Sequence, residues 1–198
     1  ARRFISQNAL QDETNCLWFW RDHWHRWDGT AYRVVPFKEI QAEITQLAKA
    51  DFDEENRDAM RNYTSETSRR QDQAAQSKGP PVCRKVTKGL IRNVAHALES
   101  MCLLAGDVQQ PTWLDVDEPF PADEVLATAS GLLHLPSLTS GEPCLLPPTP
   151  AFFSGNALPF EFDPNAECPE WLQFLESLWP DDQCSIDTLG EWFGSDDE

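Results

Sequence analysis

The sequence has 198 residues, 40% of them hydrophobic, which is enough for one sizeable core. Its formal net charge of -17 is unevenly divided. Residues 1–100 hold all sixteen Lys and Arg residues and fourteen acidic residues, whereas residues 101–198 hold nineteen acidic residues and neither Lys nor Arg. Because phosphate backbones bind cations, this division restricts any contact with nucleic acid to the first half of the chain.

The sequence also gives no sign of a membrane or of a disulfide framework. No segment approaches the roughly 20 apolar residues of a membrane-spanning helix, and the first residues contain no apolar signal-peptide run. The six cysteines are scattered without a C-x-x-C pair, which argues against a zinc cage and favours reduced thiols. We therefore expect a cytoplasmic protein with no membrane contact and no cofactor.

The first predicted element is a three-stranded β-meander. Three apolar runs alternate with polar residues, and the tight-turn signal Asp28-Gly29 separates the second run from the third. The runs cover residues 17–20, 24–27 and 30–35. We expect a type I′ turn at Gly29, because Asp-Gly pairs readily adopt the positive φ that this turn requires. The register set by this turn should bury Trp27.

The aromatic residues of this meander allow two other interpretations. Stacked indoles would bind bases, and His23 and His25, two residues apart on a strand, would face the same side as a pair of metal ligands does. Alternation along the strand, however, places Trp24 with Arg26 on one face and Trp27 on the other, and no third ligand has a fixed spacing. The sequence therefore favours a hairpin core over a stacking platform and predicts no metal site.

A short amphipathic helix is predicted directly after the meander. Apolar residues recur there at helical spacing. They are Phe37, Ile40, Ile44 and Leu47. Residues 51–81 contain many charges and few large apolar side chains and end in Gly-Pro-Pro, which predicts a poorly packed connector, helical in part before Tyr63.

A second helix is predicted from Thr87, and it carries the one strongly basic face in the chain. Its core stripe consists of Leu90, Ile91, Val94, Leu98 and Met101. Its basic stripe consists of Lys85, Lys88, Arg92 and His96. Solvated helix faces often carry such charges without binding anything. If single-stranded DNA is bound, we expect the contact to use Lys85, Lys88 and Arg92, helped by Arg69, Arg70 and Arg84.

The second half of the sequence predicts a loop, a small β unit and two helices. The loop covers residues 107–124, and short apolar runs at 132–135, 144–146 and 157–162 predict strands. A helix should begin at Pro169 and end before Pro180. Its wide apolar face consists of Trp171, Leu172, Phe174, Leu175 and Leu178. A last helix, residues 185–193, should bury Ile186, Leu189 and Trp192.

Together these elements predict an α+β fold: an N-terminal β-meander, a helical middle, a small β unit and two C-terminal helices. The expected division is 1–50 for the meander with its helix, 51–81 for the connector and 82–198 for the remainder, forming one compact domain.

Catalytic signatures are missing or poorly placed. The sequence contains neither the G-x-x-x-x-G-K-[ST] phosphate loop nor the G-x-S-x-G nucleophile turn. Two pairs, Asp51/Asp53 and Asp115/Asp117, have the composition of a two-metal nucleotidyl transferase site, but both lie in polar, loop-like segments. We expect no catalytic residue, and a divergent metal-dependent nucleotidyl transferase is kept as an alternative.

Several motifs are shared with a known family. They are Trp27-Asp28-Gly29, Thr149-Pro150 with Phe153, Asn156 to Pro159, Pro169 with Trp171 and Phe174, and Glu191-Trp192-Phe193-Gly194. Over nearly its whole length the chain resembles the connector domain of phage and plasmid primase–helicases, which is similar to the N-terminal domain of the poxviral primase–helicase.

This resemblance implies a non-catalytic module of DNA replication. Its partners would be a primase-polymerase module of the archaeo-eukaryotic type on one side and a superfamily 3 helicase on the other. The charge division suits this role, because the basic half would guide single-stranded DNA while the acidic half contacts a basic protein surface. A protein-interaction adaptor without DNA contact is the other alternative.

Overall fold

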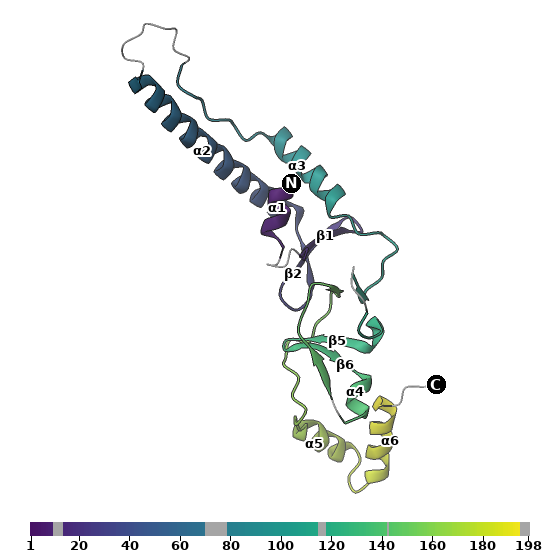
Figure 1. Ribbon diagram of the computed structural model, residues 1–198. Helices are drawn as coiled ribbons and strands as arrows, with labels where there is room; N and C mark the ends of the chain where they lie inside the picture. Colours follow the sequence, from purple (N-terminus) through teal and green to yellow (C-terminus); the bar gives the residue numbers. More distant parts are fainter. Residues whose placement is uncertain (10–13, 70–78, 115–117, 142, 195–198) are drawn as a thin grey trace. The chain divides into compact units, whose positions relative to one another are not determined.

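The computed structural model describes residues 1–9, 14–69, 79–114, 118–141 and 143–194, the side chains of 66–69 and 191–194 excepted. The chain forms two compact units, Ala1–Phe162 and Asp163–Glu198. Helices and antiparallel sheets both occur (Figure 1), which confirms the predicted α+β class. Among the described helices, none combines the length and the apolar character needed to cross a membrane.

The predicted meander is present as a three-stranded antiparallel sheet. Its strands are β1 (Leu17–Trp20), β2 (His23–Trp27) and β3 (Tyr32–Val35). One face lies against helices: Trp24 is 2% exposed, its ring centroid is 5.1 Å from that of Phe19, and Arg26 donates to both carboxylate oxygens of Glu43 at 3.0 and 2.6 Å. The predicted pairing of Trp24 and Arg26 on one face of β2 is therefore confirmed.

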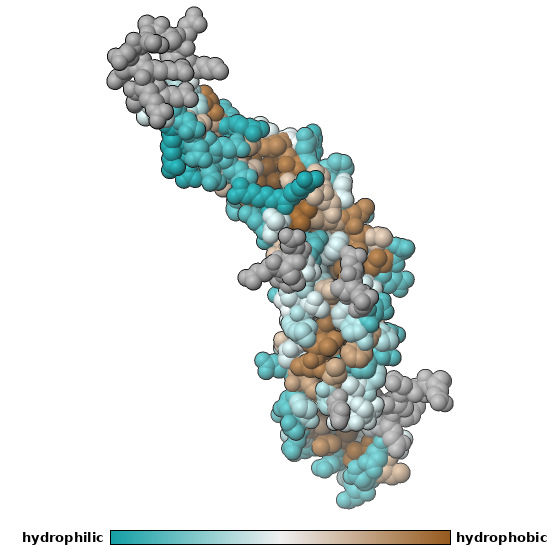
Figure 2. Space-filling view, in the orientation of Figure 1, coloured by the Kyte–Doolittle hydropathy of each residue, from teal (hydrophilic) through white to brown (hydrophobic). Residues whose placement is uncertain are grey.

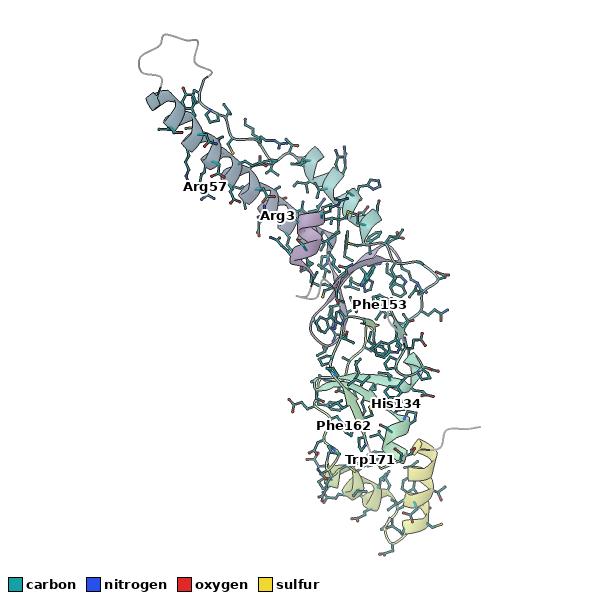
Figure 3. The ribbon with its side chains drawn as sticks, in the orientation of Figure 1. Arg3, Arg57, His134, Phe153, Phe162 and Trp171 are labelled. Carbon is teal, nitrogen blue, oxygen red and sulfur yellow. The ribbon has the colours of Figure 1, made fainter. Side chains whose placement is uncertain are left out.

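The opposite face of the sheet is buried as well, against Phe153. The Phe153 ring, labelled in Figure 3, makes edge contacts with the rings of Trp20, His25 and Tyr32, at centroid distances of 5.4, 5.8 and 4.9 Å. Tyr32 also donates its hydroxyl to the backbone oxygen of Pro150 at 2.7 Å. The sheet is thus an internal layer, and its aromatic residues are divided between two cores, as a hairpin core requires.

The β1–β2 turn is the tight one. Trp20 pairs with His23, so Arg21 and Asp22 alone connect the strands, with φ angles of +47° and +64°. Positive φ at both central residues is the hallmark of a type I′ turn. The Arg21 guanidinium lies 4.3 Å from the centre of the Trp20 ring and donates to the backbone oxygen of Gly106 at 3.3 Å, which holds the turn in place.

The β2–β3 loop differs from the prediction. Trp27 pairs with Tyr32, so four residues, 28–31, form the loop, and a two-residue type I′ turn at Gly29 is wrong. The cause is the Asp28 carboxylate, whose Oδ1 accepts the backbone N–H groups of Thr30 and Ala31, both at 2.9 Å, and so organises a wider turn. Gly29 still has a φ of +110°, and Trp27 is half-buried rather than fully buried.

Three helices cover the first face of the sheet. They are α1 (Arg2–Gln7), α2 (Phe37–Arg69) and α3 (Lys88–Met101). Figure 1 shows α2 and α3 side by side, and their packing buries one core with the sheet. This core consists of Phe4, Leu17, Trp24, Ile40, Ile44, Ile91, Ala95, Leu98 and Cys102. The predicted start of α3 is confirmed, because the Thr87 hydroxyl accepts the N–H of Leu90 at 3.2 Å as an N-cap.

The length of α2 corrects the prediction of a short helix followed by a connector at 51–81. The helix has 33 residues and ends at Arg69, and residues 70–78 lie outside the described ones. Ion pairs within the helix support it, with Lys49–Asp53 at 2.8 Å near its middle and Asp58–Arg61 at 3.5 Å in its outer half. In Figure 2 this helix is mostly hydrophilic, which explains why an apolar stripe could not reveal its length.

A second core lies within the small β unit. Its three-stranded sheet consists of β5 (Val125–Thr128), β6 (Gly131–His134) and β7 (Cys144–Leu146). Two short helices flank the strands: η1 (Ala122–Glu124) precedes β5, and α4 (Pro136–Thr139) follows β6. A separate two-stranded sheet is formed by β4 (Thr112–Trp113) and β8 (Phe152–Phe153). The core residues are Trp113, Val125, Ala127, Leu132 and Phe152. β4 and η1 lie inside the segment predicted to be a loop, 107–124.

The strand predicted at 157–162 is wrong. Only an isolated bridge joins Leu158 to Thr128, because Pro159 has no backbone N–H with which to continue a ladder.

The second unit consists of α5 (Pro169–Leu178) and α6 (Gln183–Gly194), which confirms the two predicted C-terminal helices. Of the apolar face of α5, only Leu175 is buried. The other members, Trp171, Leu172, Phe174 and Leu178, are 44–51% exposed. In α6, Ile186 and Leu189 are half-buried, and the side chain of Trp192 lies outside the described ones.

Gly29→Val should destabilise the protein by about 1–3 kcal/mol, because a β-branched residue resists a positive φ. A Cβ at Gly29 would meet no atom within 4 Å, so backbone strain alone is tested. Gly106→Val is the matched control, since its site is equally open and its φ lies outside the positive region; we expect a change within about 0.5 kcal/mol. Urea unfolding of both variants decides this, and equal midpoints would contradict the strain argument.

Asp28→Ala should destabilise the protein at pH 7, and this effect should disappear only as the pH falls to about 2 and below. Burial opposes ionisation of Asp28, but hydrogen bonds from the Ala31 and Thr30 N–H groups, the Thr30 hydroxyl and Arg33 outweigh it and lower its pKa from 3.8 to about 2. A lowered pKa stabilises the fold above the ordinary value, and this stabilisation disappears as the pH falls toward the folded-state value.

The Asp28 side chain is 40% exposed, so solvent weakens its hydrogen bonds. We therefore expect Asp28→Ala to lower the free energy of unfolding at pH 7 by about 1 kcal/mol, which is less than the sum of the separate hydrogen bonds. Unfolding should be followed at several pH values, with Asp123→Ala, an exposed carboxylate on η1, as the control. If Asp28→Ala lowered the free energy of unfolding by the same amount at every pH, the argument from the pKa of Asp28 would be contradicted.

Candidate nucleic-acid interface

A groove lies between the first turns of α2 and the start of α3. Its volume is about 810 Å³, within the range of ligand sites in proteins. Lys38 on α2 and Lys88 and Arg92 on α3 line it, together with apolar and uncharged polar residues. None of the described residues that line the groove is acidic. In a chain with 33 acidic and 16 basic residues, such a groove is a strong local departure from the average charge.

The three cations of the groove are available to a ligand. Lys38, Lys88 and Arg92 are exposed, and within the described part of the chain none of them forms an ion pair. Glu43 on α2 is already paired with Arg26, at 2.6 Å. The positive charge of the groove is therefore not neutralised by its own walls.

The first turn of α3 adds to this character. The first backbone N–H groups of a helix have no partner within the helix, and the aligned peptide dipoles favour an anion at this end. Gly89 carries no side chain there, and a Cβ would meet only the Thr87 hydroxyl, at 4.0 Å. Backbone, Lys88 and Arg92 thus face the same groove and favour the same kind of ligand.

The residues predicted to contact DNA have different positions in the structure. Lys88 and Arg92 line the groove, whereas Lys85 is exposed on the segment before α3. Arg84 lies 4.4 Å from the centre of the Phe52 ring and 3.8 Å from a Glu55 carboxylate oxygen, so its guanidinium already contacts two residues of α2. Arg69 is the last residue of α2 and its side chain is not among the described ones, and Arg70 lies outside the described residues.

Lys38 was missed by the sequence reasoning. It belongs to a helix predicted from its apolar residues, and only the packing of α2 against α3 brings it beside Lys88 and Arg92. Its position as the second residue of a helix that begins directly after Pro36 was the available signal, since the first turn of a helix is often functional at an element junction.

The Asp51/Asp53 pair does not form a two-metal site. Both residues are on α2, not in a loop, and on a helix a separation of two residues turns the side chains about 200° apart. Asp51 is paired with Arg3. Asp53 accepts a hydrogen bond from Lys49 at 2.8 Å, which is the main cause of its lowered pKa. Asp115 and Asp117 lie outside the described residues.

The two histidines of β2 differ in environment. His23 is exposed, with Nδ1 2.8 Å from the backbone oxygen of Arg21. His25 is buried between the rings of Trp20 and Phe153, and burial, with a smaller effect of His23, lowers its pKa. Within the described part of the chain, no group of three or more His, Cys, Asp or Glu side chains is placed to hold a metal ion.

Comparison with known families gives the groove and the fold a context. A family model described as "D5 N terminal like" matches residues 20–180. The chain belongs to this family. It is the family of the N-terminal region of the poxviral D5 primase–helicase, so the predicted resemblance is confirmed. Comparisons with curated proteins and with solved structures gave no significant match.

The D5 N terminal like match covers both walls of the groove. It extends from the last residue of β1 to the second residue after α5, and thus includes all of α2, α3 and the small β unit. Of the motifs that carried the resemblance, only Glu191-Trp192-Phe193-Gly194 lies outside it. The groove is therefore part of a domain related to primase–helicases.

Proposed function

We propose that this chain is a non-catalytic connector module of a DNA-replication primase–helicase. It would link a primase-polymerase module to a superfamily 3 helicase and contact single-stranded DNA. The observation that carries the DNA contact is the acid-free groove with its three cations, Lys38, Lys88 and Arg92. Family membership supports the primase–helicase context.

The geometry of the groove supports a phosphate ligand. Two walls from different helices present cations to the same space, so a strand lying in the groove would have phosphates in contact with both. Lys85, exposed just before α3, would extend this track, and Arg84, Arg69 and Arg70 are proposed as its continuation on the same part of the chain.

A protein-interaction role has its own support in the second unit. Residues 163–198 contain neither Lys nor Arg, and α5 exposes Phe174 and Leu178 at 50% and 51%. An acidic helix with exposed large apolar residues suits a basic protein surface that has an apolar groove. Such a surface on a neighbouring replication module would be its partner, and binding there does not require DNA.

The variant Lys38→Ala, Lys88→Ala, Arg92→Ala should weaken binding of single-stranded DNA and make it less sensitive to salt. Each phosphate contact contributes about 0.7 to the slope of log affinity against log salt concentration, so losing three should flatten the slope by about 2 units. Fluorescence anisotropy with a short labelled oligonucleotide, titrated at several salt concentrations, measures this slope.

The matched control is Lys49→Ala, Arg57→Ala, Arg61→Ala, which removes the same charge from exposed positions of α2 outside the groove. It should keep the wild-type slope. An unchanged slope in the groove variant, with a flattened one in the control, would place the contact on another part of the chain. Absence of binding at low salt in the wild type would favour the adaptor function.

The chain by itself should neither hydrolyse ATP nor synthesise primers. This expectation rests on the missing phosphate loop and on the opposed directions of Asp51 and Asp53. The assay is incorporation of labelled nucleotide on a single-stranded template with Mg²⁺ or Mn²⁺. Metal-dependent synthesis that is lost in Asp115→Ala, Asp117→Ala would favour the nucleotidyl transferase instead.

A further inference from the structure

Phe37 has an unusual position for a residue of the predicted apolar stripe. Its partners in that stripe, Ile40 and Ile44, are 0% and 2% exposed, whereas Phe37 is 42% exposed. It is the first residue of α2 and lines the groove beside Lys38. Among the described residues, no aromatic ring stacks on it. Its ring is therefore available to a ligand.

The ring also borders a second hollow. Phe37 and Arg92 line both the groove of about 810 Å³ and a neighbouring hollow of about 320 Å³. Phe37 and Arg92 are thus shared by the two hollows, but the smaller one is also lined by Glu99, so the acid-free groove suits a nucleic-acid strand better. Planar aromatic and guanidinium surfaces are the two protein groups on which unpaired bases stack.

Resting on the proposed contact with DNA, we infer that Phe37 is a stacking platform for one unpaired base of the bound strand. The phosphates of the same strand lie on Lys38, Lys88 and Arg92. The uncharged polar side chains of the groove, Gln41 and Thr87 among them, face the base and sugar. A base in a duplex is stacked on its neighbours and is not available to Phe37, so this platform makes the groove selective for single strands.

The alternative role of Phe37 is simple packing at the start of α2. Packing and stacking differ in what they require of the side chain. Leucine preserves most of the apolar contact but has no ring, whereas tryptophan preserves a ring of greater area. They also differ in what they require of the DNA, because only stacking depends on the presence of bases.

The test uses the full chain with Phe37→Leu, Phe37→Trp and the matched control Phe160→Leu, a Phe that is 59% exposed outside the groove. The probes are a labelled oligothymidylate, the same strand with abasic sites, and a duplex of equal length. Phe37→Leu should weaken binding to oligothymidylate about fivefold to tenfold, while Phe37→Trp and Phe160→Leu bind as the wild type does. In Phe37→Leu the slope of log affinity against log salt concentration should be unchanged, because no phosphate contact is lost.

The abasic strand separates stacking from packing. The wild type should bind it as weakly as Phe37→Leu does, and the difference between the two proteins should disappear. If Phe37→Leu binds the intact strand as the wild type does while the groove cations still set the salt slope, the stacking role is wrong and the DNA contact stands. If the groove cations do not affect binding either, the proposed function is wrong as well.

Discussion

Burial of the β1–β3 sheet on both faces is the constraint on which the first unit depends. On β2, Trp24 packs against the helices and His25 against the Phe153 ring, so each of these two side chains must match a partner, whereas His23 at the start of the strand is exposed. The same sheet fixes the start of α2, because β3 ends at Val35 and the helix begins two residues later. The groove is formed by these first turns of α2, so its position follows from the sheet.

Local pairing decides the electrostatics of the groove more than net charge does. The chain carries -17, yet Glu43 is held by Arg26 and Asp53 by Lys49, each at a short distance from its own partner. Charges more than about 10 Å away are largely screened at physiological salt, so the acidic second half does not cancel a cluster of cations in direct contact with a ligand. It does reduce long-range attraction, and the proposed DNA contact would therefore have moderate affinity and a strong salt dependence.

The sequence predicted those elements whose own residues determine them. Alternation along β2 divided Trp24 from His25 correctly, and the helical spacing of the apolar residues from Leu90 onward gave α3, because both signals are local. The length of α2 was missed because its outer half is stabilised by helix propensity and by the Asp58–Arg61 ion pair, which leave no apolar stripe. The tight turn was assigned to Gly29, since Arg21 and Asp22 lack the Gly or Asn by which such turns are recognised. Lys38 and Phe37 were missed as site residues, because a groove between α2 and α3 depends on packing of segments about fifty residues apart in sequence.

The two functions considered for this chain belong to different units and do not exclude each other. DNA contact requires cations, and within the described chain these are confined to the first unit, where the groove lies. Contact with a basic protein surface requires acidic and exposed apolar residues, and α5 has both. A module with one contact of each kind would hold a strand and a protein neighbour at the same time, whereas a pure adaptor would have no need to keep three unpaired cations beside an exposed aromatic ring. The unpaired cations of the groove are therefore the feature that favours the proposed DNA-handling connector over a pure adaptor.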